Sequence, residues 1–270
     1  MITGALYTRR PSLLARPEWS AAASHITSGD SPRSDLVLAC LLDALAQLSN
    51  LNFERDTIAS SQRSQSPGLV ISNAGRPYHT SPSQSLLSCS LSLLDDVRSQ
   101  IMQWKTCDAN FEFSSLPSNY IPSSQPYPYP MVTHFSTLHV ANIVTFYNAV
   151  LILINQFVIS MYELLSVADL RKLANNSAST QISVAVADIL KSIDYHIPYT
   201  QTTVTSSTAT SGPRNFYLLF PIRIAHRVLS QSKSLQSITQ KLWLEDVLNS
   251  IVNRAGPWAS NRKIFGTEKP

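Results

Sequence analysis

The side chains that could carry out acid–base chemistry lie mainly in one short stretch of the chain. Asp188, Asp194 and His196 provide the carboxylates and the imidazole from which a general base and its orienting partner could be built. Spacing alone does not create such a set, and a histidine at a helix end is more typical of packing and of capping free carbonyl groups. His134 and His139 are five residues apart, a spacing that places them poorly on one helix face for metal binding. We therefore expect no catalytic residue among these five.

Motifs for metals and cofactors are missing from the sequence. The three cysteines, Cys40, Cys89 and Cys107, are far apart and form no CxxC pair, which argues against a zinc site and against a disulfide framework. No GxSxG, GxGxxG, GxxxxGKS/T or HExxH motif occurs. The 7 glycines also argue against loops that cradle phosphate. We expect a chain that is not an enzyme and that uses no metal or cofactor.

Basic residues are the remaining candidates for a binding site. The chain has 21 Lys and Arg residues against 17 Asp and Glu residues, a net charge of +4, and no long basic run. Strong DNA binding requires a dense positive surface, so we do not expect this chain to bind DNA directly. Arg223 and Arg227 are four residues apart and share a helix face, and together with Arg214 they are the candidate contact for an anion or a protein partner. The alternative is surface charge that pairs with acidic residues of a neighbouring helix.

Apolar residues recur every three or four positions along most of the chain, which predicts amphipathic helices. We expect these helices at about residues 34–50, 85–105, 133–172, 180–195, 214–228 and 237–254. The region from Ala149 to Ile159 is apolar nearly all round, as expected for the central helix of a bundle. No alternating strand pattern or Asn-Gly hairpin is apparent. The predicted fold class is all-α, an irregular multi-helix bundle with long polar loops in a single domain over residues 1–270.

Three polar segments are predicted to be mobile loops. Residues 59–85 are rich in Ser, Gln, Pro and Gly, residues 114–130 contain five prolines, and residues 200–212 are almost entirely Thr and Ser. Such segments bury too little apolar surface to offset the entropy of ordering them. The most apolar segment, residues 140–167, contains Asn, Gln and Glu side chains, so we interpret it as a buried core helix and not as a membrane span.

Four short segments resemble one known family. They are Arg9–Trp19 (RRPSLLARPEW), Ser192–His196 (SIDYH), Gly212–Ala225 (GPRNFYLLFPIRIA) and the closing Trp243–Gly256. In this order they resemble the fungal-specific transcription factor domain, the regulatory region that follows the zinc cluster of fungal transcription factors. The similarity extends over about residues 5–266. Each motif is degenerate alone, and their order along the chain carries the resemblance.

The resemblance implies a helical regulatory domain in the nucleus. Such domains contact the transcription machinery or a DNA-binding regulator, form dimers or respond to an inducer, and many regulate secondary-metabolite gene clusters. The family's zinc cluster needs six closely spaced cysteines, whereas this chain has three distant ones, which again argues against direct DNA binding. Two alternatives from other classes stay open: an accessory enzyme without zinc that belongs to a biosynthetic gene cluster, and a membrane-associated protein that uses residues 140–167.

Overall fold

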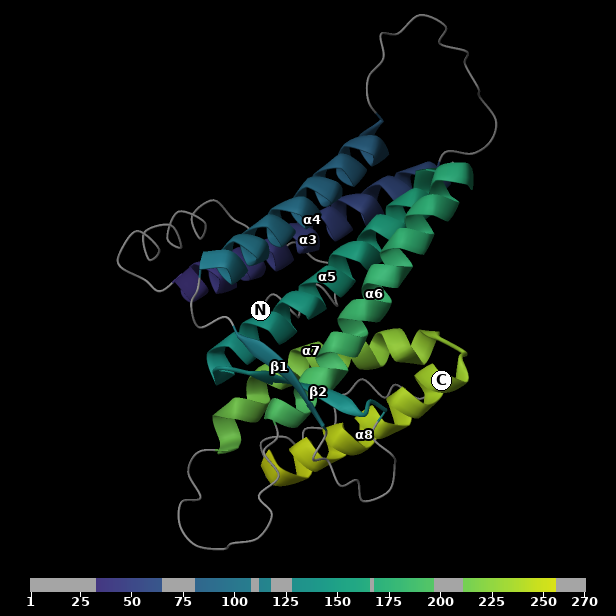
Figure 1. The fold of residues 1–270 in the computed structure, drawn as a ribbon. Helices are drawn as coiled ribbons and strands as arrows, with labels where there is room; N and C mark the ends of the chain where they lie inside the picture. Colours follow the sequence, from purple (N-terminus) through teal and green to yellow (C-terminus); the bar gives the residue numbers. More distant parts are fainter. Residues whose placement is uncertain are drawn as a thin grey trace, which may run out of the picture. The chain divides into compact units, whose positions relative to one another are not determined.

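The computed structural model describes residues 33–64, 81–107, 112–117, 128–165, 168–196 and 211–255. In these residues the chain forms six helices and one small antiparallel sheet, which confirms the predicted all-α class (Figure 1). The elements are α3 (Arg33–Ser64), α4 (Pro82–Cys107), β1 (Phe113–Pro117), β2 (Met131–Phe135), α5 (Leu138–Leu165), α6 (Ala168–His196), α7 (Ser211–Gln231) and α8 (Leu235–Ala255).

Two compact units make up the chain. The first contains Met1–Ala109 and Val150–Val184, and the second contains Asn110–Ala149 and Ala185–Pro270. The boundary falls inside both α5 and α6, so each unit includes one half of each of these helices. The chain therefore passes from one unit to the other within a helix at both places.

In the first unit, α3 lies along α4 (Figure 1). The apolar side chains that these two helices bury include Leu41, Leu45 and Leu48 of α3 and Val97, Ile101 and Trp104 of α4. Arg98 of α4 donates a hydrogen bond to the side-chain oxygen of Gln181 of α6, which ties α4 to the early half of that helix. The later part of the apolar face predicted for residues 85–105 is buried, whereas Leu91, earlier on the same face, is 37% exposed.

In the second unit, α7 packs against α8, and β1 pairs with β2 in a register that runs from Phe113 opposite Phe135 to Pro117 opposite Met131. Tyr129, which precedes β2, accepts a hydrogen bond of 2.7 Å from Gln240 of α8. Burial, with a smaller contribution from the nearby carboxylate of Asp188, raises the pKa of Tyr129 to about 12. The end of the proline-rich segment is thereby fixed to the helices.

Helix α5 is enclosed along most of its length. No residue from Val140 to Tyr162 is exposed, which fits the prediction of a central helix. By length and composition both α3 and α5 could cross a membrane, since their most apolar windows have a mean hydropathy of 1.5 and 1.8. The share of each window that is buried within the protein is 39% for α3 and 56% for α5. A core helix of a soluble protein meets the same criterion, so hydropathy does not separate the two classes.

Helix α4 starts three residues earlier than predicted, because a capping box fixes its first turn. The hydroxyl of Ser81 accepts a hydrogen bond of 3.2 Å from the backbone N–H of Gln84, and the Gln84 side chain accepts one of 3.1 Å from the N–H of Ser81. Pro82 occupies the first helical position, where its missing N–H costs nothing. The predicted loop 59–85 is therefore wrong at this end.

Helix α3 also extends beyond its predicted end near Asn50 and continues to Ser64, so the predicted loop is wrong at its beginning as well. The polar residues of this extension bond to carbonyl groups one turn back, as Asn52 does to Leu48 (2.9 Å) and Ser60 does to Asp56 (2.7 Å). A helix can thus continue where the apolar pattern fades. The remainder of the loop, residues 65–80, lies outside the described residues.

The structure corrects three further predictions. Strand β1 (113–117) takes up residues 114–117 of the predicted loop 114–130, and β2 (131–135) takes up residues 133–135 of the predicted helix 133–172. Two of the five prolines stand at the ends of this sheet, where a missing N–H is tolerated. Pro117 is the last residue of β1, and Pro130 directly precedes β2. Helix α6 is continuous across residues 173–179, where the predicted helices 133–172 and 180–195 leave a gap. Residues 118–127 lie outside the described part of the chain.

Helix α7 continues through Pro221 and does not restart there, although proline removes one helix hydrogen bond. Its first residues, 211 and 212, are helical, so the predicted loop 200–212 is wrong at its end, and residues 200–210 are not among those described. The face that α7 buries includes Leu218, Ile222 and Ala225. Phe220, which follows the same three- to four-residue apolar repeat, is only half-buried, and its ring lies 5.5 Å from that of Phe146 between centroids.

Two neighbouring residues of α4 test the burial of its apolar face. Ile101 is 1% exposed and Met102 is 57% exposed. Replacing Ile101 by Ala should lower the free energy of unfolding by about 2–5 kcal/mol, because it leaves a cavity in the core. Replacing Met102 by Ala should change it by less than about 0.5 kcal/mol. Denaturant unfolding followed by circular dichroism measures both, and equal effects would contradict the orientation of α4.

Candidate functional site

The imidazole of His196 bonds to a hydroxyl of another helix and to neither of the candidate carboxylates, Asp188 and Asp194. His196 is 1% exposed, and its Nε2 lies 3.2 Å from the hydroxyl of Thr145 of α5. Ser192, one turn back on α6, lies 3.1 Å from the same hydroxyl. Asp188 instead lies near Tyr129, where its charge contributes to the raised pKa of that phenol. His196 is therefore packed in the core, as expected. Its hydrogen-bond partner is the Thr145 hydroxyl of α5.

The hydrogen bonds around Thr145 define the state of the imidazole. The Thr145 hydroxyl donates its one hydrogen over its shortest contact, 2.7 Å to the carbonyl of Ala141, so Nε2 of His196 acts as the donor toward Thr145. Nδ1 has no hydrogen-bond partner among the described residues. Burial, opposed by a smaller effect of the Ala141 carbonyl, lowers the pKa of His196 to about 4. The neutral ring joins α5 to α6 and is closed to any substrate.

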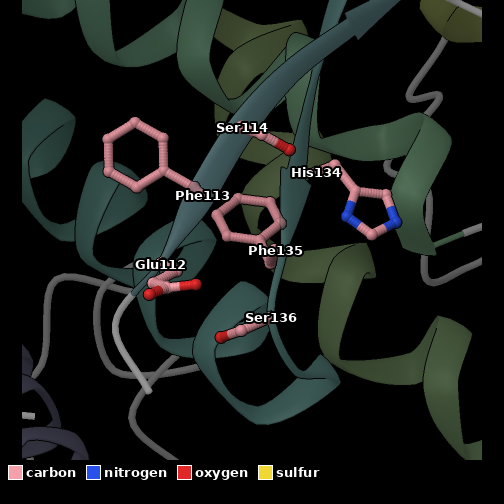
Figure 2. A pocket seen from close by; sticks show the side chains of 6 residues that line it. All are labelled: Glu112, Phe113, Ser114, His134, Phe135 and Ser136. Carbon is pink, nitrogen blue, oxygen red and sulfur yellow. The ribbon is translucent and has the colours of Figure 1, made fainter. Parts of the chain in front are cut away.

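A pocket of about 520 Å³ lies at the open end of the two-stranded sheet (Figure 2). Its lining consists of Glu112, Phe113 and Ser114 from β1 and the residue before it, and of His134, Phe135 and Ser136 from β2 and the residue after it. The N–H of Ser136 donates a hydrogen bond of 3.1 Å to the carbonyl of Glu112, which continues the ladder past the last strand pair. The backbone of the lining is therefore held on both strands.

Aromatic contacts support the β2 side of this pocket. The ring of Tyr195, at the end of α6, makes edge contacts with the rings of His134 and Phe135, at 4.9 Å and 5.4 Å between centroids. Phe135 is buried, whereas Phe113 opposite it is 60% exposed. The ladder pairs the backbones of Ser114 and His134, but among the described residues no side-chain hydrogen bond joins the Ser114 hydroxyl to the His134 imidazole. The pocket therefore offers binding groups, namely a carboxylate, an imidazole, two hydroxyls and an aromatic surface, but no activated nucleophile.

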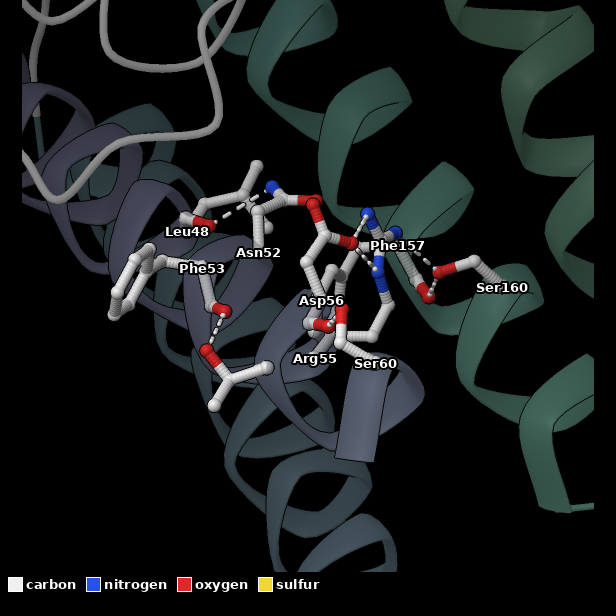
Figure 3. Close-up of polar contacts among 9 residues, drawn as sticks. Leu48, Asn52, Phe53, Arg55, Asp56, Ser60, Phe157 and Ser160 are labelled. Carbon is white, nitrogen blue, oxygen red and sulfur yellow. Dashed lines mark hydrogen bonds and ion pairs between the residues drawn. The ribbon is translucent and has the colours of Figure 1, made fainter. Parts of the chain in front are cut away.

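A second cluster of polar side chains, in the first unit, is structural (Figure 3). Arg55 of α3 binds the Asp56 carboxylate through Nε (3.0 Å) and Nη2 (2.8 Å), and its Nη1 donates to the hydroxyl of Ser160 of α5 at 2.9 Å. Its guanidinium carbon also lies 5.6 Å from the ring centroid of Phe157. Three partners occupy the guanidinium, so this cluster fastens α3 to α5.

The predicted arginine contact is only partly described. Arg223 is half-buried and Arg227 is exposed on α7, and the side chain of Arg214 lies outside the described residues. On the neighbouring helix, Glu245 of α8 pairs with other basic groups: with His226 at 3.0 Å and with Lys241 at 3.6 Å. A shared role of the three arginines in partner binding stays a prediction.

Sequence reasoning missed an apolar stripe on the outer face of α8. Leu235, Ile238 and Leu242 are 81%, 44% and 44% exposed. Their spacing of three and four residues places them on one side of the helix, whereas Trp243 and Leu244 are buried. The same spacing was available in the sequence, but periodicity alone does not say which of two apolar faces enters the core.

No cluster of metal-binding side chains occurs in the described part of the chain, where no three His, Cys, Asp or Glu groups lie close enough together to hold a metal ion. The three cysteines are free thiols; Cys40 is half-buried, and Cys89 and Cys107 are exposed. Burial, and more weakly the charges of Asp43 and Asp96, raise the pKa of the Cys40 thiol. A raised pKa keeps this thiol protonated and unreactive.

The buried imidazole of His196 makes stability depend on pH. Its pKa is about 4 in the folded chain and 6.5 ordinarily, so between these values the unfolded chain binds one more proton. The free energy of unfolding should therefore fall by roughly 3 kcal/mol as the pH drops from 7 to 4 through this group alone. His196→Gln should remove that part of the pH dependence in unfolding titrations, whereas His139→Gln, at an exposed position, should keep it. A wild-type slope in His196→Gln would refute the buried neutral ring.

Comparisons with protein-family models, with curated proteins and with solved structures find no match to this chain. The all-α class therefore rests on the helices themselves. The resemblance carried by Ser192–His196 and Gly212–Ala225 stays a prediction from short motifs. The chain is assigned to no family.

Proposed function

We propose that this chain is a helical regulatory module of transcription that acts in the nucleus by contacting other proteins, and that it is not an enzyme. The observation that carries the proposal is the outer stripe of α8, formed by Leu235, Ile238 and Leu242. Large aliphatic side chains that share one helix face and remain exposed are typical of protein-binding surfaces. The all-α fold is the class that the resemblance to the fungal regulatory domain implies.

The surroundings of the stripe support a protein partner. Lys241 and Glu245 form an ion pair of 3.6 Å on the same helix, so a polar group lies beside the apolar residues, as at the rim of an interface. The buried face of α8, with Trp243 and Leu244, holds the helix in place against the rest of its unit. A fixed helix presents the stripe at little entropic cost. The partner we propose is a DNA-binding regulator or part of the transcription machinery, with a second copy of the chain as the other candidate.

The enzyme alternative has weaker support from the geometry. The cluster of Thr145, Ser192 and His196 is closed to substrates, since all three residues are buried. An enzyme would need a base within reach of a bound substrate. The membrane alternative draws on the hydropathy of α3 and α5. We favour a core role for α5, because each of its residues from Val140 to Tyr162 is buried or half-buried.

A reporter assay tests the proposed role. The full chain, fused to an unrelated DNA-binding domain, should change transcription of a reporter relative to that domain alone. The triple substitution Leu235→Gln, Ile238→Gln and Leu242→Gln should return the reporter to the level of the domain alone, because it removes the apolar contact. All three positions are exposed, so the thermal midpoint should move by only a few degrees.

A matched control uses three apolar residues of similar exposure on α3. Leu36, Leu42 and Phe53 are 39%, 41% and 44% exposed, and their replacement by Gln should leave the reporter response intact. A fusion without any effect on the reporter would refute the regulatory role. An α8 triple variant as active as the parent chain would show that the stripe is not the contact surface.

A further inference from the structure

We propose that the pocket at the end of the two-stranded sheet binds a small organic ammonium ion. Its ammonium group would donate hydrogen bonds to the carboxylate of Glu112, and its apolar body would cover the exposed ring of Phe113. This inference goes beyond the regulatory role and does not depend on it, because it arises from the lining of the pocket alone.

The charge of the lining selects a cation. Glu112 is the only acidic residue among the six that line the pocket, and neither Lys nor Arg is among them. In the described part of the chain, no basic side chain pairs with the Glu112 carboxylate. An ammonium ion donates charge-assisted hydrogen bonds to such a carboxylate. An anion would instead approach a like charge.

The apolar part of the lining suits an organic cation better than a bare metal ion. Phe113 is 60% exposed, so a ligand that covers its ring removes apolar surface from water. Figure 2 shows the rings of Phe113 and His134 pointing in opposite directions from the strand pair, which leaves the imidazole apart from the phenylalanine surface. A single carboxylate also provides too few oxygen ligands for Ca²⁺ or Mg²⁺.

The size and the construction of the pocket fit a small molecule. A volume of about 520 Å³ falls within the range of small-ligand sites, roughly 300–1,000 Å³. The strand ladder, the bond from Ser136 N–H to the Glu112 carbonyl and the contacts of Tyr195 with β2 hold the lining before any ligand arrives. The hydroxyl of Ser114 can serve a polar substituent of the ligand.

Titration of the full-length, ¹⁵N-labelled chain with 2-phenylethylamine tests the proposal by NMR. Saturable shifts should be confined to the amides of residues 112–114 and 134–136 and their immediate neighbours. The neutral analogue 2-phenylethanol should bind about fivefold more weakly, because it lacks the contribution of an exposed ion pair, roughly 1 kcal/mol. Equal affinity for the two probes, or shifts elsewhere only, would overturn the proposal.

Two substitutions separate the roles of charge and apolar surface. Glu112→Gln should weaken binding of the amine about fivefold and leave binding of the alcohol unchanged. Phe113→Ala should weaken both probes by a similar factor, since both cover the ring. Glu54→Gln, which removes the same charge from an exposed position of α3, should affect neither. An amine affinity unchanged in Glu112→Gln would refute the proposed contact, whatever the outcome of the reporter assay.

Discussion

The enclosure of α5 is the constraint on which the rest of the structure depends. All of its residues from Val140 to Tyr162 are buried or half-buried, so each unit packs against its own part of this helix. Two polar side chains of this helix bond to carbonyl groups of the helix itself: Thr145 to Ala141 at 2.7 Å and Asn155 to Leu151 at 2.8 Å. A buried polar group left without a partner would cost about 1–3 kcal/mol.

Directional contacts then select which helices lie against α5. Apolar packing alone tolerates many combinations of side chains of similar volume, whereas a hydrogen bond requires one geometry. Arg55 reaches Ser160 in the first unit, and His196 reaches Thr145 in the second. In both cases a long or rigid polar side chain spans two helices whose contact residues are distant in sequence. The same bonds explain why polar residues are found in so apolar a core.

The surface of the second unit carries two features that its core does not use. The stripe on α8 is apolar and follows a helix, which suits another protein chain. The pocket at Glu112 combines one carboxylate with an exposed aromatic ring, which suits a small cation. These chemistries differ enough for the two features to act independently. A module that binds both a protein and a small molecule has the parts required for regulation, although coupling between them would need a change in structure that both ligands influence.

The sequence by itself determined the all-α class and the positions of α4, α7 and α8, because a repeat of three to four residues is complete within one segment. It could not show that α3 continues past Asn50 to include Arg55, because Arg55 is held there by Ser160, which lies far along the chain. Nor could it show that β1 pairs with β2, because each strand needs the other to complete its hydrogen bonds. The pocket was equally out of reach, as Glu112 and His134 meet only through that pairing. Two further features depend on burial, which only the tertiary structure determines. They are the lowered pKa of His196 and the face of α8 that packs into the core.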